Sequence, residues 1–146
     1  MKSINPKDAI GSTKPPITTV PMNVMSELGV AMMEGSIKYG KHNYRVSPVR
    51  ASVYVDAAWR HLSKWWEGED IDPDSELSHV IKAIASLTVI RDAMMQDSWC
   101  DDRPVKAKPY TEELQAQTDA VVKKYPVSVP PCLEIDNETE NSNEYR

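Results

Sequence analysis

Apolar residues recur every three to four positions in two stretches of the N-terminal half, the spacing of helices that bury one face. The first stretch predicts a helix over residues 22–39. Gly40 ends it, because glycine readily adopts the positive φ found at helix C-termini. The second predicts a helix that begins at Val49 or at Ser52 and runs to Trp66. Both helices therefore carry one apolar face and one polar face.

A third helix is predicted over residues 76–95, with Ser75 as its N-cap. Its run VIKAIASLTVI is apolar nearly all round, which indicates a helix buried in the middle of a bundle. A fourth, more polar helix is predicted over residues 110–125, where Thr111 precedes two acids of a first turn. No stretch of convincing length alternates between apolar and polar residues. We therefore expect an all-α fold, a helical bundle of about four helices.

The two ends of the chain differ in composition from its middle. The first 21 residues hold four prolines, which predicts an extended arm and not a helix. After Pro126, further prolines and then a polar, acidic stretch predict a flexible acidic C-terminal tail. We expect four segments: an extended arm over 1–21, a helical core over 22–104, an additional helix over 105–126 and a flexible tail over 127–146.

Composition and charge narrow the class of protein. The formal net charge is −5, and five acids fall near the C-terminus, so the body of the chain is nearly neutral. The sequence shows no basic patch of the kind that binds nucleic acid. No apolar run reaches the ~18–20 residues of a membrane span, and the polar N-terminus lacks a signal-peptide core, so we expect a cytoplasmic protein. Cys100 and Cys132 have no metal-binding spacing and are expected to be free thiols.

The segment RHLSKWWEGEDIDPDSELSH, residues 60–79, gathers charge between two predicted helices. Six carboxylates fall within ten residues of it: Glu67, Glu69, Asp70, Asp72, Asp74 and Glu76. Carboxylates this crowded repel one another unless water or a cation compensates, so the segment is either a solvated loop or a divalent-metal site. Mg²⁺ prefers oxygen ligands and commonly binds through a few carboxylates together with substrate phosphates.

Basic residues flank these acids along the sequence. They are Lys38, Lys41, Arg45, Arg50, Arg60 and Lys64. Acids that hold a metal and bases that hold a polyphosphate are the two halves of a nucleoside triphosphate site. The sequence has no P-loop, no dinucleotide-binding glycine motif and no nucleophilic-serine motif, so those common sites are not expected.

Several stretches occur in an order and at spacings typical of a known family. They are NPKDAIGSTKP, EGSIKYGKHNY, VRASVYVDAAWRHLSKWWEGED, PDSELSHVIKAIASL and DDRP, within residues 5–104. This part of the chain resembles the phage-encoded dATP/dGTP diphosphohydrolase-like family. That family is similar to the MazG-like all-α nucleotide pyrophosphohydrolases, including the dGTP-cleaving MazZ enzymes of phages. Three positions depart from its pattern: Tyr44 stands where tryptophan is usual, Glu76 where glycine is expected, and Lys82 where a second histidine is common.

The resemblance implies a MazG-like helical bundle that assembles as a homo-oligomer, a dimer or a tetramer, and uses Mg²⁺ or Mn²⁺. It also implies cleavage of a (deoxy)nucleoside triphosphate, expected to be dGTP or dATP, to the monophosphate and pyrophosphate. One alternative is a non-catalytic nucleotide-binding or host-interaction module on the same fold. Another is a phosphohydrolase that releases triphosphate or single phosphates. A phage-encoded protein would work in the host cytoplasm.

The clustered charges and the resemblance together assign roles within the core over 22–104, which is thus expected to be catalytic. The expected metal ligands are Glu27, Glu34, Glu69, Asp72, Asp74 and His79. The residues expected to be catalytic, by orienting the attacking water, are Glu69, Asp74 and His79. The residues expected to bind substrate are Lys38, Arg60, His61 and Lys64 at the phosphates, and Tyr39 and Asn43 near the base or sugar.

Overall fold

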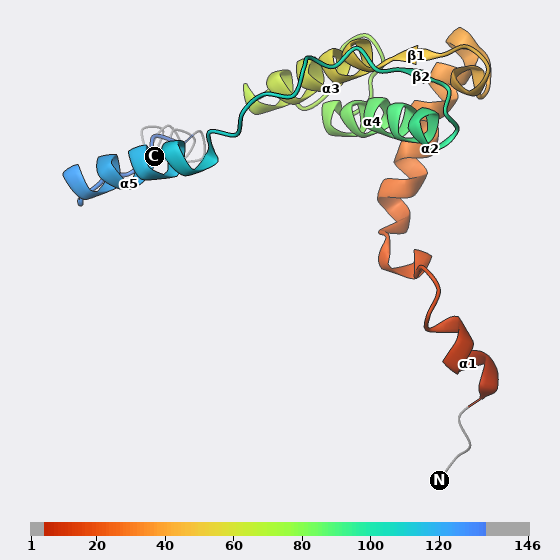
Figure 1. Cartoon of the computed structure of the whole chain (residues 1–146). Helices are drawn as coiled ribbons and strands as arrows, with labels where there is room; N and C mark the ends of the chain where they lie inside the picture. The colour runs from red at the N-terminus through yellow and green to blue at the C-terminus, as the bar shows by residue number, and fades with distance from the viewer. Residues whose placement is uncertain (1–4, 134–146) are drawn as a thin grey trace, which may run out of the picture. The chain divides into compact units, whose positions relative to one another are not determined.

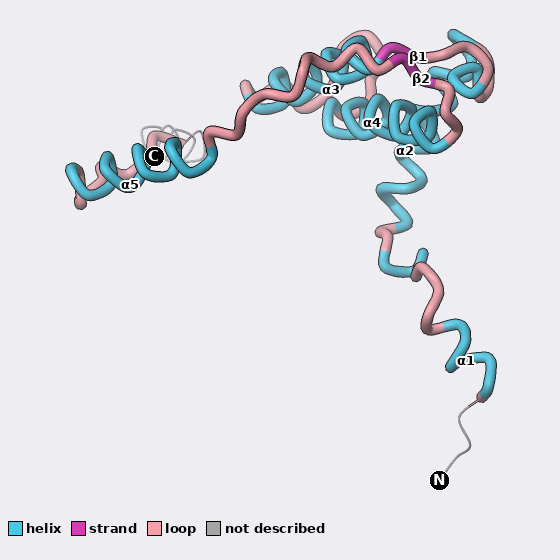
Figure 2. Tube along the Cα trace, in the orientation of Figure 1, coloured by secondary structure: helices cyan, strands magenta, loops and turns pink. Residues whose placement is uncertain are grey.

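Helices make up most of the described chain. The computed structural model describes residues 5–133, which divide along the sequence into two compact units, one ending at Arg103 and the other beginning at Pro104. Within that range the chain forms five α-helices, two short 3-10 helices and one pair of two-residue strands. Figures 1 and 2 show how the labelled helices and strands follow one another along the chain. The prediction of an all-α fold is therefore confirmed in its broad form.

Three helices form the core of the first unit: α2 (Met22–Tyr39), α3 (Ala51–Trp66) and α4 (His79–Met95). The bounds of α2 and α3 agree with the first two predicted helices. α4 packs along α3 and also contacts α2, so it is the central helix of the three (Figure 1). As its nearly continuous apolar run predicts, its buried residues lie on more than one face. They are His79, Ile81, Ala83, Ile90 and Ala93.

A small cluster of buried residues holds the start of α3 against the end of α4. It consists of Val49, Ala51, Ile90 and Ala93, and Tyr44, Tyr54, Val89 and Trp99 pack against it. Strands β1 (Val49–Arg50) and β2 (Trp99–Cys100) pair in parallel at this cluster, with Val49 opposite Trp99. The sequence does not predict these strands, because two residues show no alternation and the partner lies far along the chain.

The third predicted helix begins later than expected. Ser75, predicted as its N-cap, lies inside a turn that an antiparallel bridge between Ile71 and Ser78 closes. Glu76 adopts a φ of 57° within this turn. A residue with positive φ cannot continue into a right-handed helix, so α4 begins at His79. The predictions of a helix start at Glu76 and of a Ser75 cap are therefore wrong.

The N-terminal segment contains a helix where the sequence predicts an extended arm. Helix α1 spans Pro6–Gly11, and the 3-10 helix η1 spans Ile17–Thr19. Pro6 stands in the first turn of α1, where a proline costs no intrahelical hydrogen bond. The Asn5 side chain caps the helix by accepting a hydrogen bond from the Lys7 backbone N–H at 3.0 Å. The prediction of an arm without helix is wrong at this point.

The second unit contains α5 (Thr111–Lys124), close to the predicted fourth helix. Acids in its first turn and lysines in its last turn both suit the helix dipole. Of the predicted tail, residues 127–133 form no helix or strand, and residues 134–146 lie outside the described range. Both cysteines are free thiols, as predicted. None of the helices in residues 5–133 is long and apolar enough to cross a bilayer.

Candidate functional site

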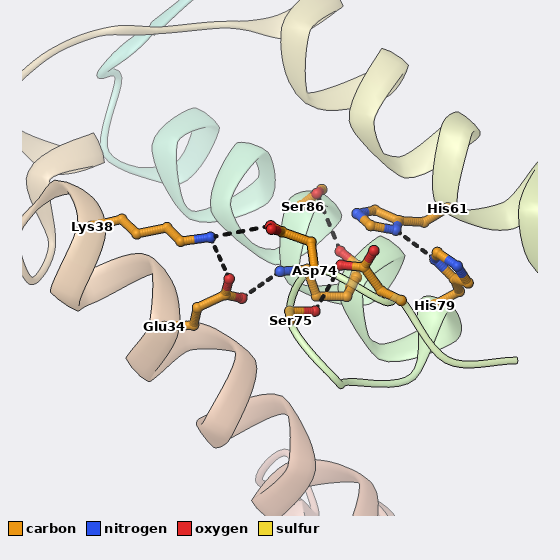
Figure 3. A network of polar contacts seen from close by, with 9 residues as sticks. Glu34, Lys38, His61, Asp74, Ser75, His79 and Ser86 are labelled. Carbon is orange, nitrogen blue, oxygen red and sulfur yellow. Dashed lines mark hydrogen bonds and ion pairs between the residues drawn. The ribbon is translucent and has the colours of Figure 1, made fainter.

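Charged and polar side chains from three helices and one loop meet between α2, α3 and α4 (Figure 3). They are Glu34 and Lys38 of α2, His61 of α3, Glu69, Asp72, Asp74 and Ser75 of the loop before α4, and His79 and Lys82 of α4. We call this set the polar network. It contains a group around Glu34, a group around His79 and the hydrogen-bonded pair of Asp72 and Ser75.

Glu34 lies between two lysines. Its Oε1 accepts a hydrogen bond from Lys38 Nζ at 2.5 Å, and its Oε2 accepts one from Lys82 Nζ. These bonds, Lys38 first and then Lys82, lower the pKa of the Glu34 carboxyl, so it is ionised at neutral pH. The bond with Glu34 also raises the pKa of Lys38, whose Nζ lies 3.8 Å from Asp74 Oδ2. One carboxylate therefore holds two ammonium groups from different helices.

His79 is fully buried and joins two other side chains. Its Nε2 lies 2.9 Å from Glu69 Oε1, and its Nδ1 lies 2.8 Å from His61 Nδ1. The hydrogen bond with His79 is the main cause that lowers the pKa of Glu69. An ionised carboxylate can only accept, so the proton lies on His79 Nε2. When both imidazoles are neutral, His79 Nδ1 accepts a hydrogen bond from His61 Nδ1–H. The ring nitrogen that keeps a free lone pair in this series of hydrogen bonds is then His61 Nε2.

Burial shifts the pKa values of two side chains here: His61, which belongs to this series of hydrogen bonds, and Asp72, which lies beside it. It is the main cause that lowers the pKa of His61, which favours a neutral imidazole. Asp72 is 8% exposed and accepts a hydrogen bond from the Ser75 hydroxyl at 2.7 Å. Burial raises the pKa of Asp72, but the bonds from Ser75 and from the Asp74 backbone N–H help to bring it below its ordinary value. The loop thus offers an ionised carboxylate with little contact with water.

A cavity of about 180 Å³ opens beside Glu34, with walls from α2 and α4. Three residues predicted to bind substrate line it: Lys38, Tyr39 and Asn43. Several other lining residues were missing from that prediction, among them Tyr44, Tyr54, Lys82 and Ser86. The volume is below the ~300–1,000 Å³ of a site for a whole drug-sized ligand, so the cavity suits one ring system of a larger molecule.

The remaining predicted residues fall into two classes. Lys64 lies near the His79 group, with its Nζ 3.4 Å from Glu69 Oε1. Glu27 and Arg60 are exposed, and within residues 5–133 no hydrogen bond or ion pair involves either side chain. The structure therefore brings most of the predicted site residues together and leaves these two apart. For Lys82 the missed signal was its spacing of four from Ser86, two polar residues in an otherwise apolar run.

The part of the chain that contains this site matches a known protein family. Residues 4–103 match the family described as dATP/dGTP diphosphohydrolase, N-terminal. The chain belongs to this family. The match contains the whole polar network and every residue that lines the cavity. The chain matches no curated protein and no solved structure.

The glycine expected at position 76 in the dATP/dGTP diphosphohydrolase family has a physical reason here. Glu76 has a φ of 57°, in the left-handed region that glycine adopts without steric cost. The backbone N–H of Glu76 donates to the Asp72 carbonyl at 2.8 Å, and the turn places His79 at the start of α4. The turn therefore keeps a glycine-type conformation although this chain has glutamate there.

A divalent cation suits this site only as an ion that arrives with a ligand. Within the described residues, no three His, Cys, Asp or Glu side chains gather in an arrangement that could hold a metal ion. Both Glu34 oxygens bond to lysines, and both ring nitrogens of His79 have partners. The Asp74 side chain, by contrast, is 85% exposed. Mg²⁺ commonly keeps several waters and binds through one or two carboxylates plus substrate phosphates, a role that suits Asp72 and Asp74.

Proposed function

We propose that the protein hydrolyses a purine deoxynucleoside triphosphate, dATP or dGTP, to the monophosphate and pyrophosphate. The observation that carries this proposal is the family match over residues 4–103, because the matched segment contains the entire polar network. The network adds chemistry that suits this reaction: ammonium groups for phosphates, and carboxylates and a histidine pair for a cation and a proton.

The cavity supports a position for the nucleoside. Tyr39 and Tyr54 offer aromatic rings, and the Asn43 side chain offers both a donor and an acceptor to the edge of a base. Lys38 lies at the same cavity, and its positive charge suits the phosphates that follow the sugar. The triphosphate would then extend from the cavity toward the loop that carries Asp72 and Asp74.

The reaction adds water across the bond between the α- and β-phosphates. The water oxygen bonds to the α-phosphorus, the bond from this phosphorus to the bridging oxygen breaks, and pyrophosphate leaves. The proton that water loses needs an acceptor, and His61 Nε2 offers a lone pair. In this scheme Glu69 and His79 orient His61 through the two hydrogen bonds of 2.9 and 2.8 Å, so they act as positioning residues.

We propose further that Mg²⁺ or Mn²⁺ is required and binds together with the triphosphate. Asp74 and Asp72 would hold it, since a carboxylate needs a free oxygen to bind a metal and Asp74 is widely exposed. The ion would neutralise negative charge on the phosphate oxygens. Glu69 and His79 already have protein partners, which supports placing them on the proton path.

The test is a panel of ribo- and deoxynucleoside triphosphates with Mg²⁺ or Mn²⁺, with products separated by chromatography. We expect dATP or dGTP to give the monophosphate and pyrophosphate in equal amounts. Release of triphosphate or orthophosphate would indicate a different phosphohydrolase. Binding of a nucleotide without turnover would indicate a non-catalytic nucleotide-binding or host-interaction module.

We also propose that the chain is a phage-type, MazG-like member of this class that works as a homo-oligomer, a dimer or a tetramer. An exposed apolar stripe on α3 supports the oligomer. It consists of Val55, Trp59, Leu62 and Trp66, and the two tryptophans are 70% and 79% exposed. Contiguous apolar surface of this kind is typical of protein interfaces. Sedimentation analysis of the full chain tests this, and a monomer at all concentrations would contradict it.

A further inference from the structure

Lys82 is a partly buried cation at the edge of the cavity. Its side chain is 18% exposed, it lines the cavity, and it donates a hydrogen bond to Glu34. A lysine in such a position needs an anion, because removing an ammonium from water is costly unless a negative group is beside it. Glu34 supplies that anion, although it also accepts a hydrogen bond from Lys38.

Two cations share the Glu34 carboxylate. It accepts hydrogen bonds from both Lys38 and Lys82. Two further acids act on these lysines without such bonds: Asp74 lies 3.8 Å from Lys38 and is 85% exposed, so water screens much of its charge, and the buried Asp72 carboxylate interacts with Lys82 through space. Neither lysine therefore has a hydrogen-bonded carboxylate of its own, and an anion with several oxygens can bond to both.

We propose that Lys82 binds the phosphate chain of the substrate together with Lys38, and that Glu34 is their internal counter-ion in the free protein. The identity of the substrate rests on the proposed function. The phosphate oxygens replace the Glu34 oxygens at the two lysines, and the nucleoside occupies the cavity between α2 and α4. Lys82 is thus a substrate-binding residue, at a position where the sequence indicated only a departure from the family pattern.

This role for Glu34 differs from the metal ligand that the sequence predicts. A cation at Glu34 would have to displace at least one ammonium, since each oxygen already accepts from a lysine. It would then lie within a few ångströms of two positive charges, where Coulomb repulsion is strong in a partly buried site. A polyphosphate meets no such repulsion, because both lysines attract it.

Helix geometry allows the exchange without a change of fold. Glu34 and Lys38 lie four positions apart on α2, and Lys82 and Ser86 lie four positions apart on α4. All four line the cavity. Long side chains such as glutamate and lysine can change rotamer while their helices stay in place. Phosphate binding therefore requires only a rearrangement of side chains at the edge of the cavity.

The experiment measures binding of inorganic tripolyphosphate to the full chain by calorimetry, without divalent cations and with a chelator present. We compare wild type with Lys82→Met, Lys82→Arg and Glu34→Gln. Lys82→Met should weaken binding by about tenfold or more, the size of one charge-assisted hydrogen bond. Lys82→Arg should keep affinity within about threefold, because the charge remains. Glu34→Gln should bind more tightly than wild type, because it frees both lysines.

A matched control removes the same charge from the other compact unit. Lys123→Met, in α5, should bind tripolyphosphate as wild type does. Circular dichroism and thermal melting establish that each variant is folded, and Lys82→Arg reports on the site if Lys82→Met does not fold. Wild type that does not bind, Lys82→Met that binds as wild type, or Glu34→Gln that binds no more tightly would each overturn the proposal.

The outcome separates this inference from the proposed function. If tripolyphosphate binds as expected and no nucleotide is hydrolysed, the role of Lys82 stands and the hydrolase assignment fails. If dATP or dGTP is hydrolysed and Lys82→Met has wild-type affinity, the assignment stands and the role of Lys82 fails. Adding Mg²⁺ extends the test to Glu34. A metal ligand predicts that Glu34→Gln weakens binding once Mg²⁺ is present, and that result overturns the counter-ion role.

Discussion

His61 and His79 share a hydrogen bond between their Nδ1 atoms, 2.8 Å apart, although they lie on different helices. The bond fixes the turn of α3 that faces the first residue of α4. Because Glu69 accepts from the other nitrogen of His79, the orientation of each ring depends on the next. The pair therefore ties the acidic loop to both helices at one point.

Replacing His79 with alanine should lower stability and turnover together. The change leaves Glu69 and His61 without their shared partner and opens a space in a fully buried position. We expect the free energy of unfolding to fall by about 1–3 kcal/mol, measured by urea denaturation. His42→Asn is the control, because His42 is exposed and its ring bonds to Tyr44. The free energy of unfolding of His42→Asn should stay within about 0.5 kcal/mol of wild type. A wild-type denaturation curve for His79→Ala would contradict the stabilising role of the hydrogen bonds that join Glu69, His79 and His61.

Asp102 should stabilise α3 in a pH-dependent way. Its carboxylate accepts hydrogen bonds from the Ser52 backbone N–H at 2.9 Å and from the Ser52 hydroxyl at 2.5 Å, in the first turn of α3. These bonds lower the pKa of Asp102 below its usual 3.8. A carboxyl with a lowered pKa contributes stability above its unfolded pKa and loses it as the pH falls through the folded one. Asp102→Ala should therefore melt below wild type at pH 7, and the difference should shrink below pH 3.8.

Asp101 offers the matched control for this measurement. Its carboxylate pairs with Arg103, two residues away on the surface, and so connects no distant elements. Asp101→Ala should change the melting temperature much less than Asp102→Ala does. Equal effects of the two substitutions at pH 7 would show that capping of α3 is not the cause.

Replacing Glu76 with glycine should stabilise the protein. The φ of 57° at Glu76 costs about 1 kcal/mol or more for a residue with a side chain, and glycine removes most of that cost. The larger conformational freedom of glycine in the unfolded chain offsets part of the gain, so we expect a net increase of up to about 1 kcal/mol. Glu67→Gly, at a residue with φ of −84°, should not stabilise. Urea denaturation of both variants measures the difference.

Replacing Asp74 with asparagine should reduce nucleotide hydrolysis and leave the fold unchanged. The side chain is 85% exposed, so its removal disturbs little packing. Loss of its charge should cost about 100-fold in kcat, the usual size for an electrostatic group at a reacting centre. Circular dichroism should match wild type. Glu113→Gln is the control, because Glu113 lies in α5 of the other compact unit, and it should retain activity. Wild-type turnover by Asp74→Asn would remove Asp74 from the site.

Helical periodicity predicts the long elements well because it depends on neighbours in sequence. The predicted helix over residues 22–39 has the bounds of α2, and α5 lies within one residue of its prediction at each end. The sequence predicts the start of α4 three residues too early because Glu76 has a positive φ, and a glutamate in the sequence gives no indication of that conformation. The strand pair depends on a contact between residues fifty positions apart, and no local pattern contains that information.

The residues of the site likewise fall into those that local spacing predicts and those that depend on packing between helices. Spacing of four on one helix places Glu34 beside Lys38, and the sequence predicts both as site residues. Tyr54 and Ser86 line the cavity only because α3 and α4 pack with particular faces toward α2, which is a tertiary property. The hydrogen bond from Lys82 to Glu34 joins two helices and is likewise invisible in either segment alone.

Pairing of β1 with β2 has a consequence for how the molecule opens. The strand before α3 and the strand after α4 are bonded to each other, so these two helices and the acidic loop form a closed ring of chain. Neither helix can leave without breaking that ring, and amide protons in both should exchange with solvent together, as one cooperative unit. α2 lies outside the ring and contacts it mainly through α4. Departure of α2 alone would therefore open the cavity and separate Glu34 from Lys82, while the histidine pair stays closed.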